Sequence, residues 1–267
     1  MVDIRFGKKL NVDIFIPARL DSKRLSKKHL MEINGEPLIK ILVKRLQKSE
    51  LIRNVIVCTT DQKTDDELVE FLEKENILVF RGSEKDIIHR FLKAAEFFQT
   101  EIIIDVEGDK IYTDVEYVDL IVNELKNSDY DFVTGSSSKD EYDFTASIHG
   151  FVPAGIKISA LKKIFQFKKI DNTETGYKEF FTSNPIIKKK FVTSDIEIPE
   201  NSRFTIDYPE DYECAKIIFS KLGKFFGIND VIELIKNQPR LMSNLQNIVK
   251  RWSKNYKNNM TDVSLNK

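Results

Sequence analysis

The stretch that decides the fold is VDIFIPARLDSKRLSKKHL, residues 12–30. Its first six residues form an apolar run rich in β-branched and aromatic side chains, which predicts a buried strand. The loop that follows has one acidic residue, Asp21, and five basic side chains within ten positions: Arg19, Lys23, Arg24, Lys27 and Lys28. A buried strand that leads directly into a basic loop indicates an α/β sheet with an anion site at the strand end.

The sequence on both sides of this loop alternates between strand-like and helix-like runs. Strands are predicted at residues 12–17, 54–60, 77–80 and 101–106. Helices, in which apolar residues recur every three or four positions, are predicted at residues 37–49, 64–76, 84–98 and 114–125. This order predicts a Rossmann-like, mostly parallel sheet with helices on both faces. Functional residues are expected just after the strands, because such sheets bind ligands beyond the carboxyl ends of their strands.

The alternation weakens after residue 135, and the chain divides into four predicted parts. These are a nucleotide-binding α/β core at 1–135, an inserted layer at 136–200, a return of the core at 201–255 and a flexible tail at 256–267. Within the insertion, strand-like runs are predicted at 155–159, 188–192 and 195–198, and a short helix at 161–167. The returning part is predicted to hold a strand at 203–206 and helices at 229–237 and 241–252.

The composition excludes several classes of protein. The chain has 42 basic and 42 acidic side chains, and this balance argues against a general nucleic-acid binder. No apolar run approaches the ~20 residues of a membrane span, and the first residues lack a signal-peptide pattern. A cytoplasmic protein without membrane insertion is therefore expected. Cys58 and Cys214 are expected to be buried free thiols.

The basic loop suits a polyanion on physical grounds. Each cation within ~4 Å of a phosphate oxygen contributes about 4 kcal/mol of Coulomb energy at an effective dielectric near 20, before desolvation. Two or three such contacts would hold a triphosphate. The glycine-rich P-loop pattern is absent. On charge alone, a solvated basic loop is an equally good interpretation.

Several segments, in the right order, extend the case over nearly the whole chain. The loop fits the pattern PAR-x-x-S-x-R-L-x-x-K-x-L and is followed by NGEPLI at 34–39. It resembles the signature of the cytidylyltransferases that make CMP-activated sugars, namely the CMP-Kdo synthetases and the spore-coat-polysaccharide type. Further segments resemble those of the latter type: RGSEKDIIHRF at 81–91, VEGDK at 106–110, RFTIDYPEDYE at 203–213 and VIELIKNQPRLMSNLQ at 231–246.

The resemblance implies both an architecture and a reaction. It implies a GT-A-like nucleotidyltransferase fold with an inserted dimerisation and substrate layer, and therefore a homodimer. The implied reaction transfers CMP from CTP to a sugar or sugar acid, such as Kdo or another 2-keto-3-deoxy sugar acid, with release of pyrophosphate. The product would serve surface polysaccharide, lipopolysaccharide or glycoconjugate biosynthesis.

The resemblance also implies roles for particular residues. Catalytic residues and triphosphate contacts carry over to Arg19, Arg24 and Lys28, with Asp109 as a fourth catalytic residue. The remaining nucleotide contacts carry over to Pro17, Ala18, Ser22, Arg81, Gly82 and Ser83. The family's Mg²⁺ ligands carry over to Asp109 and Asp207.

The metal assignment has a physical rationale and an alternative. Mg²⁺ usually binds one or two carboxylates together with substrate phosphate, and two strand-end aspartates from distant parts of the chain could meet at one crevice. Alternatively, Asp109 only ends a strand and Asp207 caps the helix that starts near Pro209. Asp211 is interpreted as a first-turn charge of that helix.

Three departures from the family pattern are expected to matter. The family has proline-glycine where this chain has Ser26-Lys27, so Lys27 is a further possible phosphate contact. It has an acidic or cysteine residue and then proline where this chain has Lys110-Ile111, so Lys110 is expected to pair with Asp109 or to reach substrate or phosphate. The inserted layer matches least, and its candidate acceptor contacts are His149, Tyr177, Glu179 and Lys157.

Two other functions stay open at this stage. A glycosyltransferase that consumes a nucleotide sugar is disfavoured, because the strand-end run EGDKIYTD at 107–114 lacks an Asp-x-Asp motif. A non-catalytic nucleotide-binding partner is kept open by the substitutions at 26–27 and 110–111.

Overall fold

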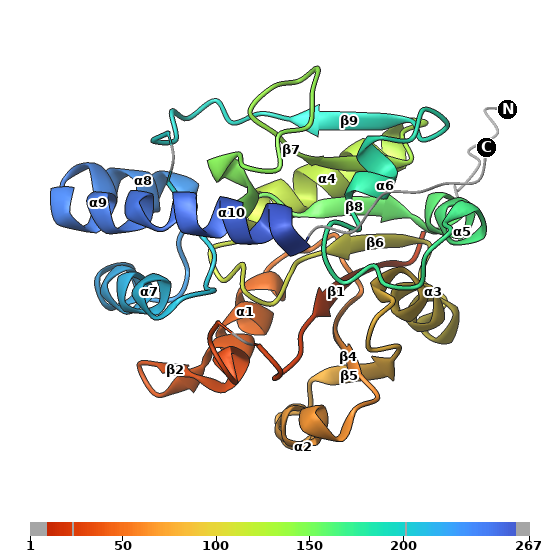
Figure 1. Cartoon of the computed structure of the whole chain (residues 1–267), viewed down its shortest axis with the longest axis horizontal. Helices are drawn as coiled ribbons and strands as arrows, with labels where there is room; N and C mark the ends of the chain where they lie inside the picture. Colours follow the sequence, from red (N-terminus) through yellow and green to blue (C-terminus); the bar gives the residue numbers. More distant parts are fainter. Residues whose placement is uncertain (1–9, 23, 201, 260–267) are drawn as a thin grey trace, which may run out of the picture.

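The computed structural model describes residues 10–22, 24–200 and 202–259. Lys23 of the basic loop and residues 260–267 of the predicted tail lie outside the described residues. A seven-stranded sheet has the strand order β5-β4-β1-β6-β8-β7-β9 (Figure 1). The first four of these strands are mutually parallel, which confirms the predicted mostly parallel α/β sheet.

The elements have the following bounds. The strands of the sheet are β1 Val12–Pro17, β4 Asn54–Thr60, β5 Leu78–Gly82, β6 Ile102–Asp105, β7 Phe132–Gly135, β8 Ala154–Lys157 and β9 Lys189–Val192, and β2 Glu32–Ile33 pairs separately with β3 Glu36–Pro37. The helices are α1 Leu38–Leu46, α2 Asp66–Lys74, α3 Ile87–Phe98, α4 Val115–Asn127, α5 Ile158–Phe167, α6 Glu179–Thr182, α7 Pro209–Leu222, α8 Ile228–Lys236, α9 Pro239–Asn247 and α10 Val249–Asn259.

The central strands are buried on both faces, because helices cover both sides of the sheet. Successive side chains of a strand point to opposite faces. In β1, Ile14 and Ile16 join one apolar core with residues of α1, α4, α7 and α8, whereas Phe15 joins a second core with residues of α3 and α5. Figure 1 shows α1 and α7 on one side of the sheet and α3 and α5 on the other.

The segment 136–200 is joined more closely to the core than the sequence predicts. Strand β8 lies between β6 and β7 and runs antiparallel to both, and β9 pairs in parallel with β7. The predicted inserted layer therefore supplies two strands of the central sheet. Strand β7, Phe132–Gly135, is not among the predicted strands.

Two predicted strands are wrong. Residues 195–198 and 203–206 lie outside the sheet. The backbone of the second segment binds elsewhere, because the Ile206 N–H donates to the Asp109 carbonyl and the Ile206 carbonyl accepts from the Lys28 ammonium. The polar groups of Ile206 thus contact the loops after β1 and β6 and do not pair with a strand.

The C-terminal part also differs in detail from the prediction. The helix predicted at 241–252 is two helices, α9 and α10, which meet at Ile248. Because α10 continues to Asn259, residues 256–259 of the predicted flexible tail are helical, which corrects that boundary.

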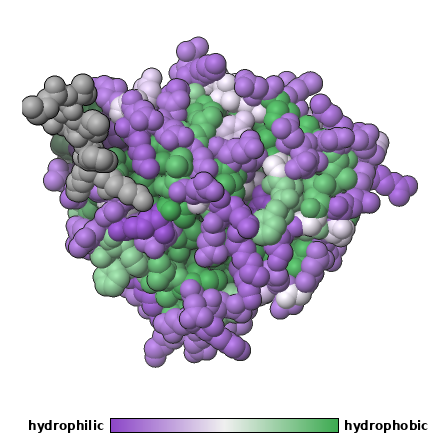
Figure 2. All heavy atoms as spheres, turned by 180° about the vertical axis from the view of Figure 1, so that it is seen from behind, coloured by the Kyte–Doolittle hydropathy of each residue, from purple (hydrophilic) through white to green (hydrophobic). Residues whose placement is uncertain are grey.

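The two cysteines fit the expectation from the sequence. Cys58 in β4 and Cys214 in α7 are free and buried, as predicted. Within the described part of the chain, no helix combines the length and the apolar character needed to cross a bilayer. Figure 2 shows hydrophobic side chains divided into several areas by hydrophilic ones, on the face opposite that of Figure 1.

A close backbone approach fixes the segment that carries Arg203. The turn at Ser147–Gly150 packs against this segment, and a Cβ atom added at Gly150 would lie 2.4 Å from both the Cβ and the carbonyl oxygen of Phe204. Glycine at position 150 is therefore required for this packing.

Replacing Gly150 with Ala should lower the free energy of unfolding by about 1–3 kcal/mol, because the Phe204 backbone must shift to make room. Urea denaturation measures the change. Lys139→Ala, at an exposed position in the preceding loop, is the control and should stay within about 0.5 kcal/mol of the wild type. A Gly150→Ala variant as stable as this control would contradict the packing argument.

Candidate active site

A cleft of about 850 Å³ opens beyond the carboxyl ends of β1 and β6. Its lining combines the loops after these two strands with the start of α3, the segments 142–150, 172–178 and 202–207, and one face of α10. Parallel sheets bind their ligands at this edge. Ten predicted site residues line the cleft: Pro17, Ala18, Arg19, Ser22, Arg24, Lys28, Asp109, His149, Tyr177 and Asp207.

The loop after β1 makes its turn without the glycine that the family pattern has at position 27. Lys27 adopts a left-handed conformation, with φ 52° and ψ 26°, which costs a non-glycine residue roughly 1–2 kcal/mol. Its ammonium pairs with Glu67 at 2.5 Å, outside the cleft. The hypothesis that Lys27 is a further phosphate contact is therefore not supported by its position, although the loop keeps its turn.

Lys28 joins the two predicted metal aspartates. Its Nζ atom donates to Asp109 Oδ2 at 3.0 Å and to Asp207 Oδ1 at 2.9 Å. Burial alone would lower the pKa of Lys28, but the carboxylates of Asp109 and Asp207 outweigh burial and raise it. The ammonium therefore stays charged in a place shielded from water.

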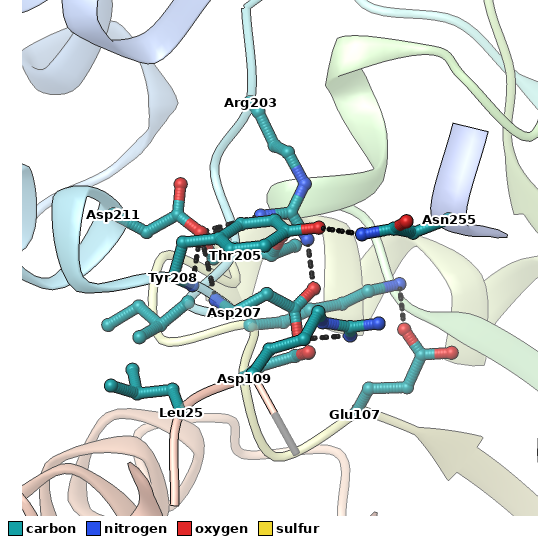
Figure 3. A network of polar contacts seen from close by, with 12 residues as sticks. Leu25, Glu107, Asp109, Arg203, Thr205, Asp207, Tyr208, Asp211 and Asn255 are labelled. Carbon is teal, nitrogen blue, oxygen red and sulfur yellow. Dashed lines mark hydrogen bonds and ion pairs between the residues drawn. The ribbon is translucent and has the colours of Figure 1, made fainter. Parts of the chain in front are cut away.

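Asp207 is the centre of this network. Its Oδ1 atom also accepts from Arg24 at 2.6 Å, and its Oδ2 atom accepts from Arg203. Burial would raise the pKa of Asp207, but Lys28, Arg203 and Arg24 hold it well below its usual range. Figure 3 shows Asp207 between Arg203 and Asp109. Distant parts of the chain thus meet at one carboxylate.

Tyr208, and not Asp207, is the N-cap residue of helix α7, and Asp211 at the third helical position completes its capping box. The Asp211 carboxylate accepts from the backbone N–H groups of Asp207 and Tyr208, both at 2.9 Å, and pairs with Arg203 at 2.8 Å. The capping alternative for Asp207 is therefore wrong, and the first-turn position predicted for Asp211 is confirmed.

The two aspartates differ in how well they fit a Mg²⁺ ion. Asp109 Oδ1 is buried and has no hydrogen-bond partner among the described residues, so this oxygen is available as a ligand. Both oxygens of Asp207 already contact cations. No group of three or more His, Cys, Asp or Glu side chains that could hold a metal occurs in the described parts of the chain. Asp109 can therefore bind the ion without losing a present contact. Asp207 can bind it only if one of its three cations releases a carboxylate oxygen.

A second set of cations is held by Glu174, which also lines the cleft. Arg19 Nη1 lies 3.7 Å from Glu174 Oε2, and Arg90 donates to Glu174 Oε1 at 2.9 Å. Arg90 also donates to the Ser83 carbonyl at 2.8 Å, although only 2% of its surface is exposed. The carboxylate of Glu174 thus holds two guanidinium groups at the cleft wall.

A buried polar cluster forms the floor beyond β6. Glu107 contacts Lys110 at 2.9 Å and Lys178 at 3.0 Å, and Lys178 also lies 3.2 Å from Asp105. Burial raises the pKa of Asp105, although Lys178 opposes the shift. The contact of Lys110 with Glu107 corrects the expectation that Lys110 pairs with Asp109.

Two predicted acceptor contacts belong to the same end of the cleft. The Tyr177 hydroxyl donates to Asp105. His149 Nε2 lies 2.6 Å from the Asp143 carbonyl oxygen. Burial, with a smaller contribution from Lys110, lowers the pKa of His149 to about 3, so its imidazole is neutral at pH 7.

The segment predicted to line the cytidine pocket lies at the margin of the cleft. The Arg81 guanidinium donates to the Thr60 carbonyl at 3.0 Å and pairs with Asp66 at 2.7 Å, so it ties β5 to the start of α2. Gly82 packs against the Arg90 side chain, which lies 3.1 Å from an added Cβ. Ser83 lines a neighbouring hollow.

Two further predicted acceptor contacts, Glu179 and Lys157, do not line the cleft. Glu179 accepts a hydrogen bond from Tyr256 at 2.9 Å, and its carboxylate is not part of the cleft lining. Lys157 donates to the Ser128 carbonyl at 2.9 Å, at the end of β8.

Several charged residues of the cleft are absent from the predictions, among them Arg90, Arg203, Glu174 and Lys178. Arg90 and Arg203 lie within motifs that carry the family resemblance, so the motifs contained a signal for them. Glu174 and Lys178 lie in an irregular stretch without periodicity, and only the tertiary structure brings them to the site.

Comparisons with known proteins agree with this geometry. Residues 14–218 match a family model described as cytidylyltransferase. A spore coat polysaccharide biosynthesis protein of Bacillus subtilis is 28% identical over 243 residues, which are 84% of this chain and 93% of that protein. An uncharacterized protein of Methanocaldococcus jannaschii is 29% identical over 240 residues, which are 87% of this chain and 93% of that protein.

The fold has a close counterpart among solved structures. A cytidylyltransferase from Leptospira borgpetersenii serovar Hardjo-bovis superposes with a TM-score of 0.76 and 30% identity. The match covers 87% of this chain and 97% of that protein.

The buried imidazole of His149 should make stability depend on pH. Its pKa of about 3 in the folded state is below the ordinary value of 6.5, so the unfolded chain binds the proton more readily between these values. Stability should therefore fall as pH falls from 6.5 toward 3, by up to about 1.4 kcal/mol per pH unit from this group. Urea denaturation of the wild type and of His149→Gln between pH 4 and 7 measures the effect. Equal slopes for the two proteins would contradict it.

Proposed function

Because the chain belongs to the cytidylyltransferase family and is a CTP-dependent nucleotidyltransferase, we propose that it transfers CMP from CTP to a 2-keto-3-deoxy sugar acid such as Kdo. The observation that carries this proposal is that Arg24, Lys28 and Asp109 converge in one cleft at the carboxyl ends of β1 and β6. Membership in the family favours this function over a glycosyltransferase and over a non-catalytic partner.

The proposed triphosphate site is the basic side of the cleft. Arg24 and Lys28 are held by Asp207, and Arg19 is held by Glu174. Phosphate oxygens can replace these carboxylates as hydrogen-bond acceptors, and charge-assisted contacts of this kind are among the strongest hydrogen bonds in proteins. The cations are thus positioned before the nucleotide arrives.

The proposed chemistry is an in-line displacement at phosphorus. An acceptor hydroxyl oxygen attacks the α-phosphorus of CTP, the bond from that phosphorus to the bridging oxygen breaks, and pyrophosphate leaves. The hydroxyl proton passes to solvent. Arg24 and Lys28 stabilise the charge that moves onto the departing pyrophosphate. No covalent intermediate with the protein is needed.

A Mg²⁺ ion is proposed as the cofactor. When bound, such an ion neutralises phosphate oxygens and orients the reacting groups. The unpartnered oxygen of Asp109 supports a direct ligand role for this residue, and Asp207 stays a second proposed ligand.

The acceptor is proposed to lie at the end of the cleft beyond β6. Lys110 and Lys178 supply two ammonium groups at this end of the cleft, which suits the carboxylate of a sugar acid. His149 and Tyr177 line the same region and are proposed to contact the sugar. The relative from Bacillus subtilis supports a place in surface polysaccharide or glycoconjugate biosynthesis.

The proposal extends to the state of the protein in the cell. We propose a cytoplasmic homodimer, as the family resemblance implies, with no nucleic-acid partner. Light scattering should give twice the mass of one chain.

Pyrophosphate release tests the proposed reaction. The protein is incubated with Mg²⁺, each of the four nucleoside triphosphates, and a panel of 2-keto-3-deoxy sugar acids and sugar phosphates. Release that needs both CTP and a sugar acid is the expected result. Release with a sugar phosphate alone, or with another nucleotide alone, would refute the proposed substrates.

Arg24→Ala should raise the KM for CTP by about 10–100-fold, because a charge-assisted hydrogen bond to phosphate contributes about 1.5–3 kcal/mol. Steady-state kinetics with varied CTP measure the change. Lys27→Ala is the matched control from the same loop, and it should behave like the wild type because Lys27 pairs with Glu67 outside the cleft. Unchanged CTP kinetics in Arg24→Ala would remove Arg24 from the phosphate site.

Asp109→Asn should lower Mg²⁺-dependent turnover by about 10²–10³-fold while the protein stays folded, because asparagine keeps the shape but loses the charge. Turnover is measured over a range of Mg²⁺ concentrations, and circular dichroism checks the fold. Asp21→Asn, at an exposed acid of the same cleft, is the control and should keep wild-type turnover. Retained activity in Asp109→Asn would exclude the proposed ligand role.

A further inference from the structure

Helix α10 presents one face to the cleft. Val249, Trp252, Asn255 and Tyr256 all line the cleft. Their spacing of three, three and one places them on a single side of an α-helix, because residues three, four and seven apart share a face. Basic residues of the same helix that are exposed instead are Arg251, Lys254 and Lys257. One face of the helix therefore lines the cleft, and the opposite face is basic and exposed to solvent.

The aromatic side chains of this face form a continuous cluster with the 142–150 segment. The rings of Phe144 and Tyr256 are stacked, with centroids 5.1 Å apart and planes 16° apart. The rings of Trp252 and Tyr256 have centroids 5.4 Å apart. All three side chains are half-buried, so part of each ring surface faces the cleft.

Contacts with the site hold this cluster in place. The Arg203 guanidinium, which binds Asp207, lies 5.0 Å from the centroid of the Trp252 ring. Asn255 donates to the Tyr208 hydroxyl at 2.8 Å, and Figure 3 shows this pair beside Asp207. Helix α10 is thus attached to the same segment that anchors the basic loop.

The topology assigns the cluster to one half of the cleft. The loop after β1 and the start of α3 serve the half over β1 and β4, where the nucleotide is proposed to lie. Tyr256 of α10 stacks on Phe144 and donates to Glu179, which directly follows Lys178 of the polar cluster in the other half. The aromatic face therefore adjoins the proposed acceptor and not the cytosine base.

We propose that Trp252 and Tyr256 form an aromatic wall against which the acceptor sugar ring stacks, so that Trp252 sets the affinity for the acceptor. The inference rests on the proposed function. One face of a sugar ring carries mainly C–H groups and suits an aromatic surface, whereas its charged and hydroxyl groups need polar partners. Lys110 and Lys178 supply such partners on the floor of the same half.

The single tryptophan makes the wall directly observable. Trp252 is the only tryptophan among 267 residues, so intrinsic fluorescence reports on this position alone. The sugar acid that gives the fastest pyrophosphate release serves as the probe. Its addition to the wild-type protein with CTP should change the fluorescence in a saturable manner, with a midpoint near its KM. An unchanged signal with a sugar acid that is turned over would overturn the inference.

Kinetics separate a stacking surface from a merely structural one. Trp252→Ala should raise the KM for the sugar acid by about tenfold and leave the KM for CTP within about twofold. Trp252→Phe, which keeps a flat ring, should restore most of the acceptor affinity. An equal rise of both KM values in Trp252→Ala, or a phenylalanine variant as weak as the alanine variant, would contradict stacking.

A variant of the opposite helix face controls for loosened docking of α10. Arg251 is exposed, pairs with Glu210 at 3.0 Å and does not line the cleft. Arg251→Ala should keep the wild-type KM for the sugar acid, and a rise as large as that of Trp252→Ala would refute a direct contact by the ring. If no sugar acid is turned over by the wild type, the proposed function fails, and the inference fails with it. Turnover with an unchanged acceptor KM in Trp252→Ala overturns the inference alone.

Discussion

The structure depends on the need to pair one buried carboxylate. Asp207 is 2% exposed and contacts the side chains of Arg24, Lys28 and Arg203. An unpaired charge in such a place costs several kcal/mol, so the segments that carry these cations have to meet there. The loop after β1 is therefore tied to the segment before α7, which lies about 180 residues later in the chain. Lys28 extends the same network to Asp109 and the loop after β6.

This network explains why the cleft suits a polyphosphate. Arg24 and Lys28 already have carboxylate partners before any ligand binds, and Lys28 is also buried. A ligand with phosphate oxygens needs to exchange acceptors and does not have to order long side chains, which reduces the entropic cost of binding. A second carboxylate of the cleft acts in the same way, because Glu174 holds both Arg19 and Arg90. A site built on paired charges also agrees with a chain whose formal net charge is zero.

The two halves of the cleft come from different parts of the topology. The parallel strands β1 and β4 provide the half with the basic loop, whereas the other half depends on elements that follow β6. Strand β8 enters the sheet between β6 and β7, and its connections carry the 142–150 and 172–178 segments to the cleft. Helix α10 then closes this half from the C-terminal side. The contact between Lys28 of the basic loop and Asp109 of the loop after β6 joins the two halves.

The sequence by itself determined the parallel sheet and the basic loop at the end of β1. Its motifs also predicted Arg24, Lys28, Asp109 and Asp207 as site residues. These features are local, because apolar periodicity and short motifs are properties of neighbouring residues. Only the tertiary structure decided that Lys110 pairs with Glu107, that Arg81 and Glu179 do not line the cleft, and that 203–206 is not a strand. It also brought Glu174, Lys178 and Trp252 to the site. Each of these outcomes depends on which distant groups satisfy a buried charge, hydrogen bond or ring face, and no local pattern encodes that choice.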